Sequence, residues 1–413
     1  MTKIAEQVQL GGMLVKKKTA ALGFAAVVVA AAIFGGIRTG EKNTYAETAE
    51  TDGAAVVAEI AESAEAAETE EATDIFETSD TAETAERTIR YSRPEEEATY
   101  GPTGARERID FNALEYRTED ESAPVVYFTD NISPEGLMNI YHMLGVTPQG
   151  NVGVKVSTGE AGNNHYLNPN LIKDLVWEVN GTIIETNTAD VGGLRATTAM
   201  HYQVAADHGW TDLAKVDIMD EFGTTRLPVT GGEYLKEVEI GESLESYDFV
   251  LVLSHFKGHG IAGFGGALKN TAIGFSSPNG KLLIHSGGVG SPDGSFPSST
   301  QEAFTSCMAE AAKTYYELFD NGNNILYINV MNNLSIDCDC IGTPAAPTMA
   351  NVGILASRDP VALDQACLDI VHAAPDGGDI TARVDALQGV HTLEHAAEIG
   401  FGSRNYRLDI IDE

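Results

Sequence analysis

The sequence has 413 residues, of which 43% are hydrophobic, and its 61 acidic residues outnumber its 26 basic residues, for a formal net charge of -35. This length and apolar content suffice for two or three compact units with a hydrophobic core. A chain this acidic is repelled by phosphate backbones and anionic lipid head groups, because binding to either depends on Lys and Arg. The charge therefore excludes nucleic acid as a partner.

The first distinctive element is an apolar stretch near the N-terminus. Residues 1–18 are a basic segment that ends in three lysines, and residues 19–37 carry no charge. A helix of that length, at ~1.5 Å per residue, just spans the hydrocarbon layer of a bilayer. Lysines ahead of such a helix mark its cytoplasmic side. The sequence predicts a transmembrane anchor or a cleaved signal peptide, and so a protein held at the outer face of the cell membrane or secreted.

Residues 38–122 have the composition of an acidic linker. Within them, residues 45–86 contain 14 acidic and no basic residues, in Ala/Glu/Thr-rich phrases. Repulsion between like charges and a shortage of large apolar side chains leave the cost of ordering such a segment uncompensated. We expect a disordered linker that joins the N-terminal segment to a folded domain.

Residues 123–413 have the composition of that domain. Helix starts are predicted at Ser133-Pro134, Asn168-Pro169 and Asp359-Pro360, where an N-cap residue precedes a Pro in the first helical position. Short β-rich runs occur at 125–128, 152–156, 182–185, 216–219, 249–253, 282–284, 325–330 and 352–355. Strands that alternate with helices predict an α/β fold with a mostly parallel sheet and helices on both faces.

The strand predicted at 249–253 leads directly into a candidate site. It is followed by Ser254-His255-Phe256-Lys257-Gly258-His259 and then by a glycine-rich loop over 260–270. Ligands of parallel sheets bind beyond the carboxyl ends of strands, and glycines let the backbone approach a ligand. A hydrogen-bonded structural role for His255 and a surface position for Lys257 are the competing interpretations. The catalytic candidates are His259, Lys269 and His255, and the candidates for substrate binding are Lys257, Gly265, Gly266 and Asn270.

The cysteines form a second candidate centre. Cys338 and Cys340 are separated by one residue and flanked by Asp337 and Asp339. Thiolates favour a transition metal, and we expect Fe, Zn or Ni with Cys338, Cys340 and His285 as ligands. Two thiolates do not close a tetrahedral site, so His255, His259 or His285 would have to complete it. The alternatives are a disulfide with Cys307 or Cys367, which are otherwise expected in the core, or reduced thiols.

Several motifs together resemble a known family. These motifs are residues 254–270, Gly280-Lys281 with His285, residues 337–340, residues 354–366, and His391-Thr392-Leu393-Glu394-His395. Their order resembles the domain of unknown function 362 family over roughly residues 123–410. Members of that family are often fused to ferredoxin-type iron-sulfur modules, whereas this sequence contains no Cys-x-x-Cys-x-x-Cys run. The family name implies no activity.

A more distant resemblance does imply chemistry. The spacing of His259, Lys269 and His285 is similar to that in the N-terminal domain of the nickel-pincer lactate racemase family. The resemblance implies that His259 is a proton-transfer base, that Lys269 tethers the pincer nucleotide and that His285 is a nickel ligand. Residues 156–160 and 185–190 depart from that family's Asp-x-Thr-Arg-Pro loop and second catalytic His.

Two classes of function follow. The first is a membrane-tethered extracytoplasmic enzyme, linked to a metal or an iron-sulfur centre, that performs redox or proton-transfer chemistry on a small anionic substrate. A separate redox partner is expected with it. The alternative is a non-catalytic extracytoplasmic carrier of a metal or another ligand in the same pocket.

Overall fold

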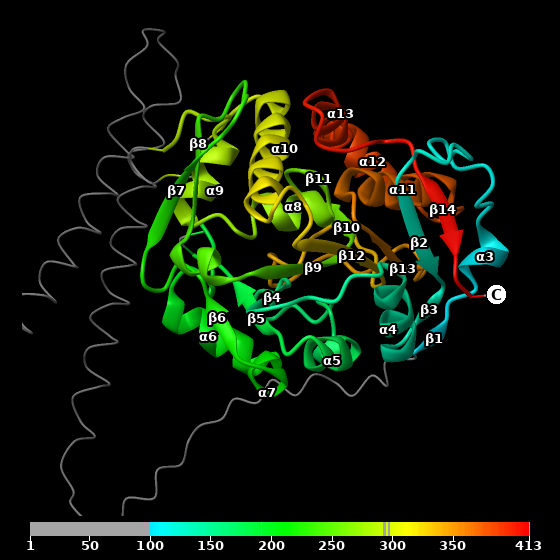
Figure 1. Cartoon of the computed structure of the whole chain (residues 1–413), viewed down its shortest axis with the longest axis horizontal. Helices are drawn as coiled ribbons and strands as arrows, with labels where there is room; N and C mark the ends of the chain where they lie inside the picture. The colour runs from blue at the N-terminus through cyan, green and yellow to red at the C-terminus, as the bar shows by residue number, and fades with distance from the viewer. Residues whose placement is uncertain (1–99, 191, 292–294, 296–297, 413) are drawn as a thin grey trace, which may run out of the picture. The chain divides into compact units, whose positions relative to one another are not determined.

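The fold is organised around one eight-stranded sheet with helices on both faces (Figure 1). The structure is a computed structural model that describes residues 100–412 apart from 191, 292–294 and 296–297. The α/β class and the mostly parallel sheet predicted from the sequence are confirmed. The predicted anchor at 19–37 and most of the predicted linker lie outside the described residues. None of the described helices is long and apolar enough to cross a bilayer.

The strand order of the sheet places five parallel strands side by side, from β12 to the β6 edge. The order is β14-β2-β13-β12-β9-β4-β5-β6. Strand β13 runs antiparallel to β12 and β2, and the other neighbours in the sheet are parallel. The strands are β2 (Val125–Thr129), β4 (Val152–Lys155), β5 (Thr182–Glu185), β6 (Val216–Ile218), β9 (Phe249–His255), β12 (Ile325–Met331), β13 (Gly353–Ser357) and β14 (Arg407–Ile410).

Three antiparallel pairs lie outside this sheet. The pair nearest the site is the hairpin of β10 (Lys257–His259) and β11 (Gly263–Gly265), which follows β9 directly. The other pairs are β1 (Gly101–Pro102) with β3 (Asn131–Ile132), and β7 (Thr224–Pro228) with β8 (Glu237–Gly241).

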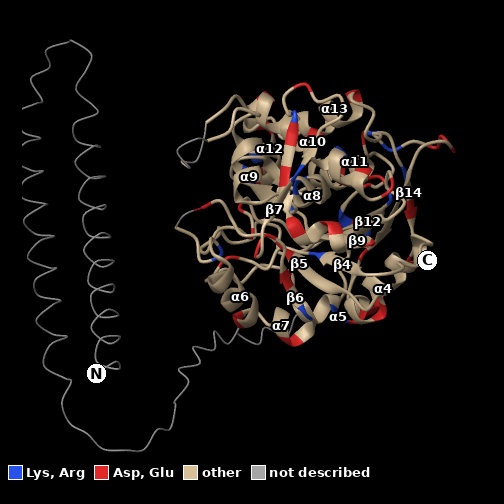
Figure 2. Ribbon diagram, turned by 60° about the vertical axis from the view of Figure 1, so that its left-hand side comes forward, with Lys and Arg blue, Asp and Glu red and all other residues tan. Residues whose placement is uncertain are grey.

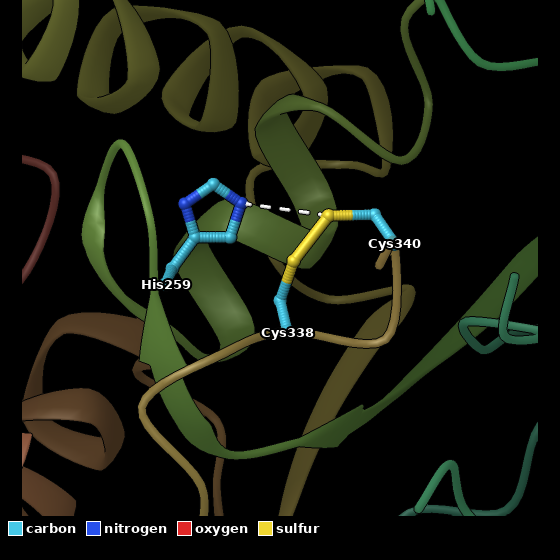
Figure 3. Close-up of side chains that lie close together, drawn as sticks. All are labelled: His259, Cys338 and Cys340. Atoms are coloured by element: carbon cyan, nitrogen blue, oxygen red, sulfur yellow. Dashed lines mark hydrogen bonds between the residues drawn. A yellow bond between two sulfur atoms is a disulfide. The ribbon is translucent and has the colours of Figure 1, made fainter. Parts of the chain in front are cut away.

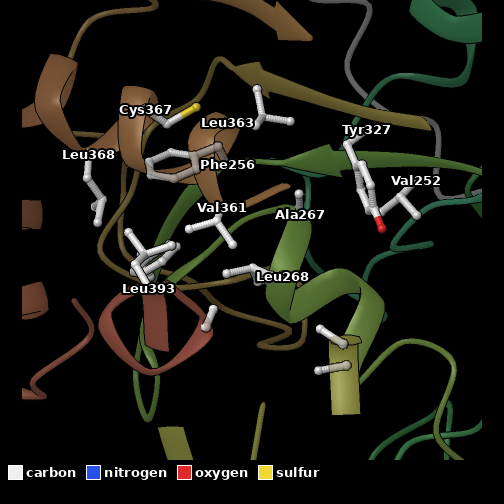
Figure 4. Close-up of a cluster of buried hydrophobic side chains, with 14 of the residues drawn as sticks. Val252, Phe256, Ala267, Leu268, Tyr327, Val361, Leu363, Cys367, Leu368 and Leu393 are labelled. Carbon is white, nitrogen blue, oxygen red and sulfur yellow. The ribbon is translucent and has the colours of Figure 1, made fainter. Parts of the chain in front are cut away.

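Helices cover each face of the sheet, and the central strands are buried on both. In β9, Leu251 and Leu253 point into one core, whereas Val250 and Val252 point into the other, as the period-2 geometry of a strand requires. Figure 4 shows part of the core that contains Val250 and Val252, with Val252 and Tyr327 on the strand side and Ala267 and Leu268 on the helix side. One face carries α4 (Pro134–Met143), α5 (Pro169–Glu178), α6 (Thr198–Asp207) and α7 (Trp210–Leu213). The other carries α8 (Ala267–Ala272), α9 (Pro278–His285), α10 (Gln301–Leu318), α11 (Pro360–Ala373), α12 (Gly378–Ala386) and α13 (His391–Glu398).

The helix starts read from the sequence are confirmed. The side chain of Ser133 accepts a hydrogen bond from the backbone N–H of Gly136, and those of Asn168 and Asp359 accept from the first turns of their own helices. Each caps a helix whose first residue is Pro, which has no N–H to leave unpaired.

Two expectations were wrong. Residues 282–284, predicted as a strand, lie in α9, which starts at Pro278 behind the N-cap Ser277. The linker predicted over 38–122 extends too far, because α3 (Ala105–Arg108) and the buried residues Ile109 and Phe111 belong to the folded part. Burial of these apolar side chains against the core stabilises this part of the chain.

Candidate functional site

The candidate site is a cavity at the carboxyl ends of the central parallel strands. It has a volume of about 130 Å³ and is lined by residues at or just beyond the ends of β4, β5 and β9, and by the loop that follows β12. The chain proceeds outward from β4 to β5 and β6 in one direction, and from β9 to β12 in the other. Ligands of open α/β sheets bind at such a reversal of strand order. The topology thus accounts for the place of the cavity.

A close backbone approach brings the β10–β11 hairpin against the loop after β12. Gly258 donates its N–H to the carbonyl of Ser335 at 2.8 Å. A Cβ at Gly258 would lie 2.6 Å from Cα of Ile336, so only glycine fits. The contact places His259 next to the cysteine-bearing part of that loop.

Cys338 and Cys340 are joined by a disulfide beside His259 (Figure 3). The Sγ atom of Cys340 lies 3.9 Å from Nε2 of His259. Cys338 is buried and Cys340 is exposed, so the pair connects the cavity to solvent. The predicted alternative of a disulfide with Cys307 or Cys367 is wrong, because both are free, buried cysteines.

The hydrogen bonds of His259 determine which ring nitrogen carries the proton. Its Nδ1 accepts from the backbone N–H groups of Ile261 at 3.1 Å and Ala262 at 2.9 Å. The neutral ring therefore carries its proton on Nε2, which faces Cys340. Burial, and then Lys269 and His285, hold the pKa of His259 well below its ordinary value. His259 is a neutral N–H donor to the cavity.

This arrangement does not fit a resident metal ion in the state that the structure describes. One ligand atom each from His259, Cys338 and Cys340 lies within 4.8 Å of the others, which is a spacing that could hold a metal. Metal ligation, however, needs thiolates and a free imidazole lone pair. Here the two sulfurs are bonded to each other, and the lone pair of His259 is taken by backbone N–H groups.

Two predicted site residues, His255 and Lys257, are held by one buried carboxylate. The Asp339 side chain interacts with Nδ1 of His255 at 3.2 Å and accepts a hydrogen bond from Lys257. Nε2 of His255 lies 2.5 Å from the carbonyl of Asn332, so neither ring nitrogen presents a lone pair to the cavity. Burial acts to raise the pKa of Asp339, but Lys257 and His255 outweigh it and hold that pKa below its ordinary value.

On the opposite wall of the cavity, a second buried carboxylate, that of Glu185, pairs with two cations. It accepts from Lys155 at 2.8 Å and from Arg195 at 3.3 Å. Arg195 also donates to Glu160 at 3.2 Å. Burial acts to raise the pKa of Glu185, but these two cations lower it to about 2. The wall is therefore a fixed network of charged groups.

Two further lysines in the lining lack a carboxylate partner. Lys281 donates to three neutral oxygens, those of Thr186, Asn187 and Ser276, at 2.5 to 2.8 Å. The side-chain amine of Lys269 has neither a hydrogen bond nor an ion pair with any residue that the structure describes. Burial lowers the pKa of Lys281 to about 7; burial, followed by the cations Lys155 and Arg195, lowers that of Lys269 to about 8.

Positive charge exceeds negative charge in the cavity lining, although the chain as a whole is acidic. Figure 2 shows acidic positions spread over the outer helices and loops, with basic positions also among the strands of the central sheet. The acidic lining residues are Glu185 and Asp339, and the basic ones are Lys155, Arg195, Lys257, Lys269 and Lys281. Such a lining favours a small anion.

The structure brings nearly all predicted site residues to this cavity. Its lining includes the predicted residues His255, Lys257, His259, Gly265, Gly266, Lys269, Asn270, Cys338 and Cys340. His285 is not in the lining: its ring stacks on Phe304 with centroids 4.7 Å apart, and its Nδ1 lies 2.7 Å from the carbonyl of Lys281.

Sequence reasoning missed the charged residues of the opposite wall. They are Lys155, Glu185 and Arg195. The sequence did contain a signal for two of them, because Lys155 and Glu185 are each the one charged residue at the end of a strand. Buried charges in such places are rarely tolerated without a partner or a ligand.

Comparison with known proteins identifies a family for this chain. A family model described as "Domain of unknown function (DUF362)" matches residues 152–369, as the sequence motifs indicated. The lactate racemase apoprotein from Thermoanaerobacterium thermosaccharolyticum is similar at a TM-score of 0.30 and 14% identity, over 52% of each chain. A protein of known structure from Thermotoga maritima is similar at a TM-score of 0.35 and 13% identity, over 57% of each chain. This chain thus spans about half the length of either structure, and similarity this weak assigns no reaction. No curated protein matches the sequence.

Proposed function

The chain belongs to the DUF362 family, and from that premise we propose that it is an enzyme that carries out two-electron redox chemistry on a small anionic molecule. Its redox centre is the Cys338–Cys340 pair. One observation carries the proposal: the two sulfurs line the same small cavity as an excess of buried cationic side chains.

The cations supply the affinity for an anion. Lys269 is half-buried, and its amine has no partner among the described residues, which is costly for a cation. The Nε2–H group of His259 adds a neutral donor at the same wall. A bound anion would supply the charge and the acceptors that these groups lack.

The cysteine pair supplies the electrons. In the reduced state its two thiols would give up two electrons and two protons as the S–S bond forms, and the bound anion would take up both. A dithiol on a separate redox protein would restore the thiols by exchange. Cys340 is exposed and is the sulfur that an outside thiolate can reach, so Cys338 would be the leaving thiolate, released toward the cations of the cavity.

We place this domain outside the cytoplasm, on a tether at the cell membrane or secreted. The uncharged segment 19–37 behind three lysines supports this placement. The disulfide supports it too, since disulfides persist mainly in oxidising compartments.

A single-turnover experiment on the full-length chain tests the proposal. The pair is reduced, the reductant is removed without oxygen, and 2-oxo carboxylates and inorganic oxyanions are added one at a time. We expect at least one of them to re-form the disulfide, scored by mass spectrometry as the loss of two alkylation sites, with the anion reduced in equal amount.

Matched cysteine variants serve as controls. Cys338→Ser/Cys340→Ser should abolish reduction of the anion, whereas Cys307→Ala and Cys367→Ala should retain it, because those free cysteines lie in the core. Reduction of the anion by the double variant at the wild-type rate would disprove the redox centre.

The second candidate function is a non-catalytic carrier of a small anion. The observation that favours it is that several cavity cations are locked in fixed networks around Glu185 and Asp339, as a rigid binding site requires. Tight binding of an anion by calorimetry, with no re-formation of the disulfide by any compound, would favour the carrier.

A further inference from the structure

Lys269 differs from every other lysine of the cavity. Lys155 donates to Glu185 and to two further oxygens, Lys257 to Asp339, and Lys281 to three oxygens. Lys269 lies on the short helix α8, lines the cavity beside Gly265, and pairs with no described residue. Its amine is therefore not engaged in holding the fold together.

The surroundings of Lys269 favour its neutral amine. Burial removes water from the ammonium, and the cations Lys155 and Arg195 repel it. A pKa of about 8 in place of 10.5 leaves roughly two orders of magnitude more neutral amine at pH 7 than an exposed lysine has. A desolvated lysine next to other cations is the arrangement that makes an amine nucleophilic.

We infer that the Lys269 amine forms an imine with the carbonyl group of a small oxo carboxylate bound in the cavity. The inference rests on the proposed function in one respect, that the cavity takes a small anion. It adds the class of substrate, an acid that also carries an aldehyde or ketone.

The step is balanced without any oxidant or reductant. The nitrogen lone pair of Lys269 attacks the carbonyl carbon, a C–N bond forms, and the π electrons move to the carbonyl oxygen. That oxygen takes up the proton that the nitrogen loses, and the carbinolamine results. Loss of water then breaks the C–O bond and leaves C=N. The Nε2–H group of His259 is a neutral donor that can stabilise the charge developing on the oxygen.

The rest of the cavity suits the carboxylate end of such an acid. Lys155 and Arg195 face the cavity from the opposite wall, and the hydrogen bonds of the Lys281 amine go to neutral oxygens. A volume of about 130 Å³ is well below the ~300–1,000 Å³ of pockets for drug-sized ligands. The cavity therefore selects for an acid of a few heavy atoms.

Reductive trapping tests the inference on the full-length chain. The chain is mixed with pyruvate or glyoxylate at pH 8, sodium borohydride is added, and the modified peptide is identified by mass spectrometry. We expect one carboxyalkyl group per chain, on Lys269. Acetone, a carbonyl compound without a carboxylate, should give no more label there than on surface lysines.

The control variant is Lys173→Arg, which changes a lysine of α5 that lies over the Trp177 ring. It should trap normally, whereas Lys269→Arg should not. Because peptide mapping of the unchanged chain locates the label directly, the test does not depend on the variants folding. Label spread evenly over surface lysines, or full trapping by Lys269→Arg, would overturn the inference.

The yield should also depend on pH in a defined way. The yield of trapped product should rise from pH 6, reach half its maximum near pH 8 and level off above about pH 9, because only the neutral amine attacks. The titratable and charged groups that interact with Lys269 come from several elements: Lys155, Arg195, Asp339, Glu185, His259 and His285. A yield that rises only above pH 10, as for an exposed lysine, would contradict the assignment.

The outcomes separate this inference from the redox proposal. The Cys338→Ser/Cys340→Ser variant should still trap pyruvate at Lys269, since the cysteines take no part in imine formation. Trapping of pyruvate without any redox turnover would support the imine and disprove the redox centre. Redox turnover without trapping would support the redox centre and disprove the imine.

Discussion

At the scale of single residues, Lys269 shows the conflict between stability and function that is common at binding sites. The residue is half-buried and its ammonium has no described partner, so it costs stability where it is charged. An apolar side chain of similar length fills the same space without that cost. The residue is thus explained by what it can do for a ligand, not by what it does for the fold.

We expect Lys269→Met to raise the free energy of unfolding by about 1–3 kcal/mol at pH 7 while it abolishes trapping of pyruvate. The unfolded lysine keeps its proton up to its ordinary pKa of 10.5, whereas the folded one loses it near 8. The wild-type chain therefore gains stability as the pH rises from about 8 to about 10.5, and the advantage of the variant shrinks over that range. Urea unfolding at pH 7 and pH 10 measures this; a destabilised variant at pH 7 would show that the ammonium stabilises the fold.

At the scale of elements, one buried carboxylate determines where α8 begins. Asp364 of α11 accepts from the backbone N–H groups of Ala267 at 2.8 Å and Leu268 at 2.9 Å, and from the side chain of Asn329 at 2.7 Å. A Cβ at Gly266 would lie 2.4 Å from that carboxylate, which explains the glycine. Asp364 therefore fixes the helix that carries Lys269.

Asp364→Ala should lower the free energy of unfolding by about 3 kcal/mol or more, because it leaves buried N–H groups without an acceptor. Asp364→Asn keeps one oxygen and should cost less. Asp379→Ala, at an exposed position in the first turn of α12, serves as the control and should stay within about 0.5 kcal/mol of the wild type. Chemical denaturation measures all three, and an Asp364→Ala chain as stable as the control would refute this role.

Sequence patterns predicted elements well where the signal is local. The caps at Ser133, Asn168 and Asp359 were read correctly because an N-cap followed by Pro needs no tertiary information. Residues 282–284 were misread because three apolar residues fit a strand and a buried helix equally well.

For the site, the residues that follow β9 were predicted because they lie together in the sequence. The opposite wall was not, because Lys155, Glu185 and Arg195 meet that segment only in the folded sheet. The pairing of Cys338 with Cys340 also could not be predicted from the sequence. Four cysteines allow several pairings, and only the loop conformation joins Cys338 to Cys340.

At the scale of the whole molecule, the disulfide contributes little to stability. It closes a loop between residues only two apart in the sequence. In the chain-entropy model, so short a loop is worth about 1.6 kcal/mol at 25 °C, against ~3 kcal/mol for a loop of about 15 residues. The pair is therefore better explained by chemistry at the cavity than by a need to hold the fold together.

The most direct test of the central claim is a redox titration of the Cys338–Cys340 pair in the full-length chain, in dithiothreitol and glutathione buffers, read by alkylation and mass spectrometry. We predict a reversible two-electron transition above about −300 mV, the range of exchangeable rather than structural disulfides. Elemental analysis of the same samples should show no stoichiometric metal on the oxidised pair. A disulfide that resists reduction throughout, or a pair that remains reduced and holds stoichiometric Fe, Zn or Ni, would contradict the account.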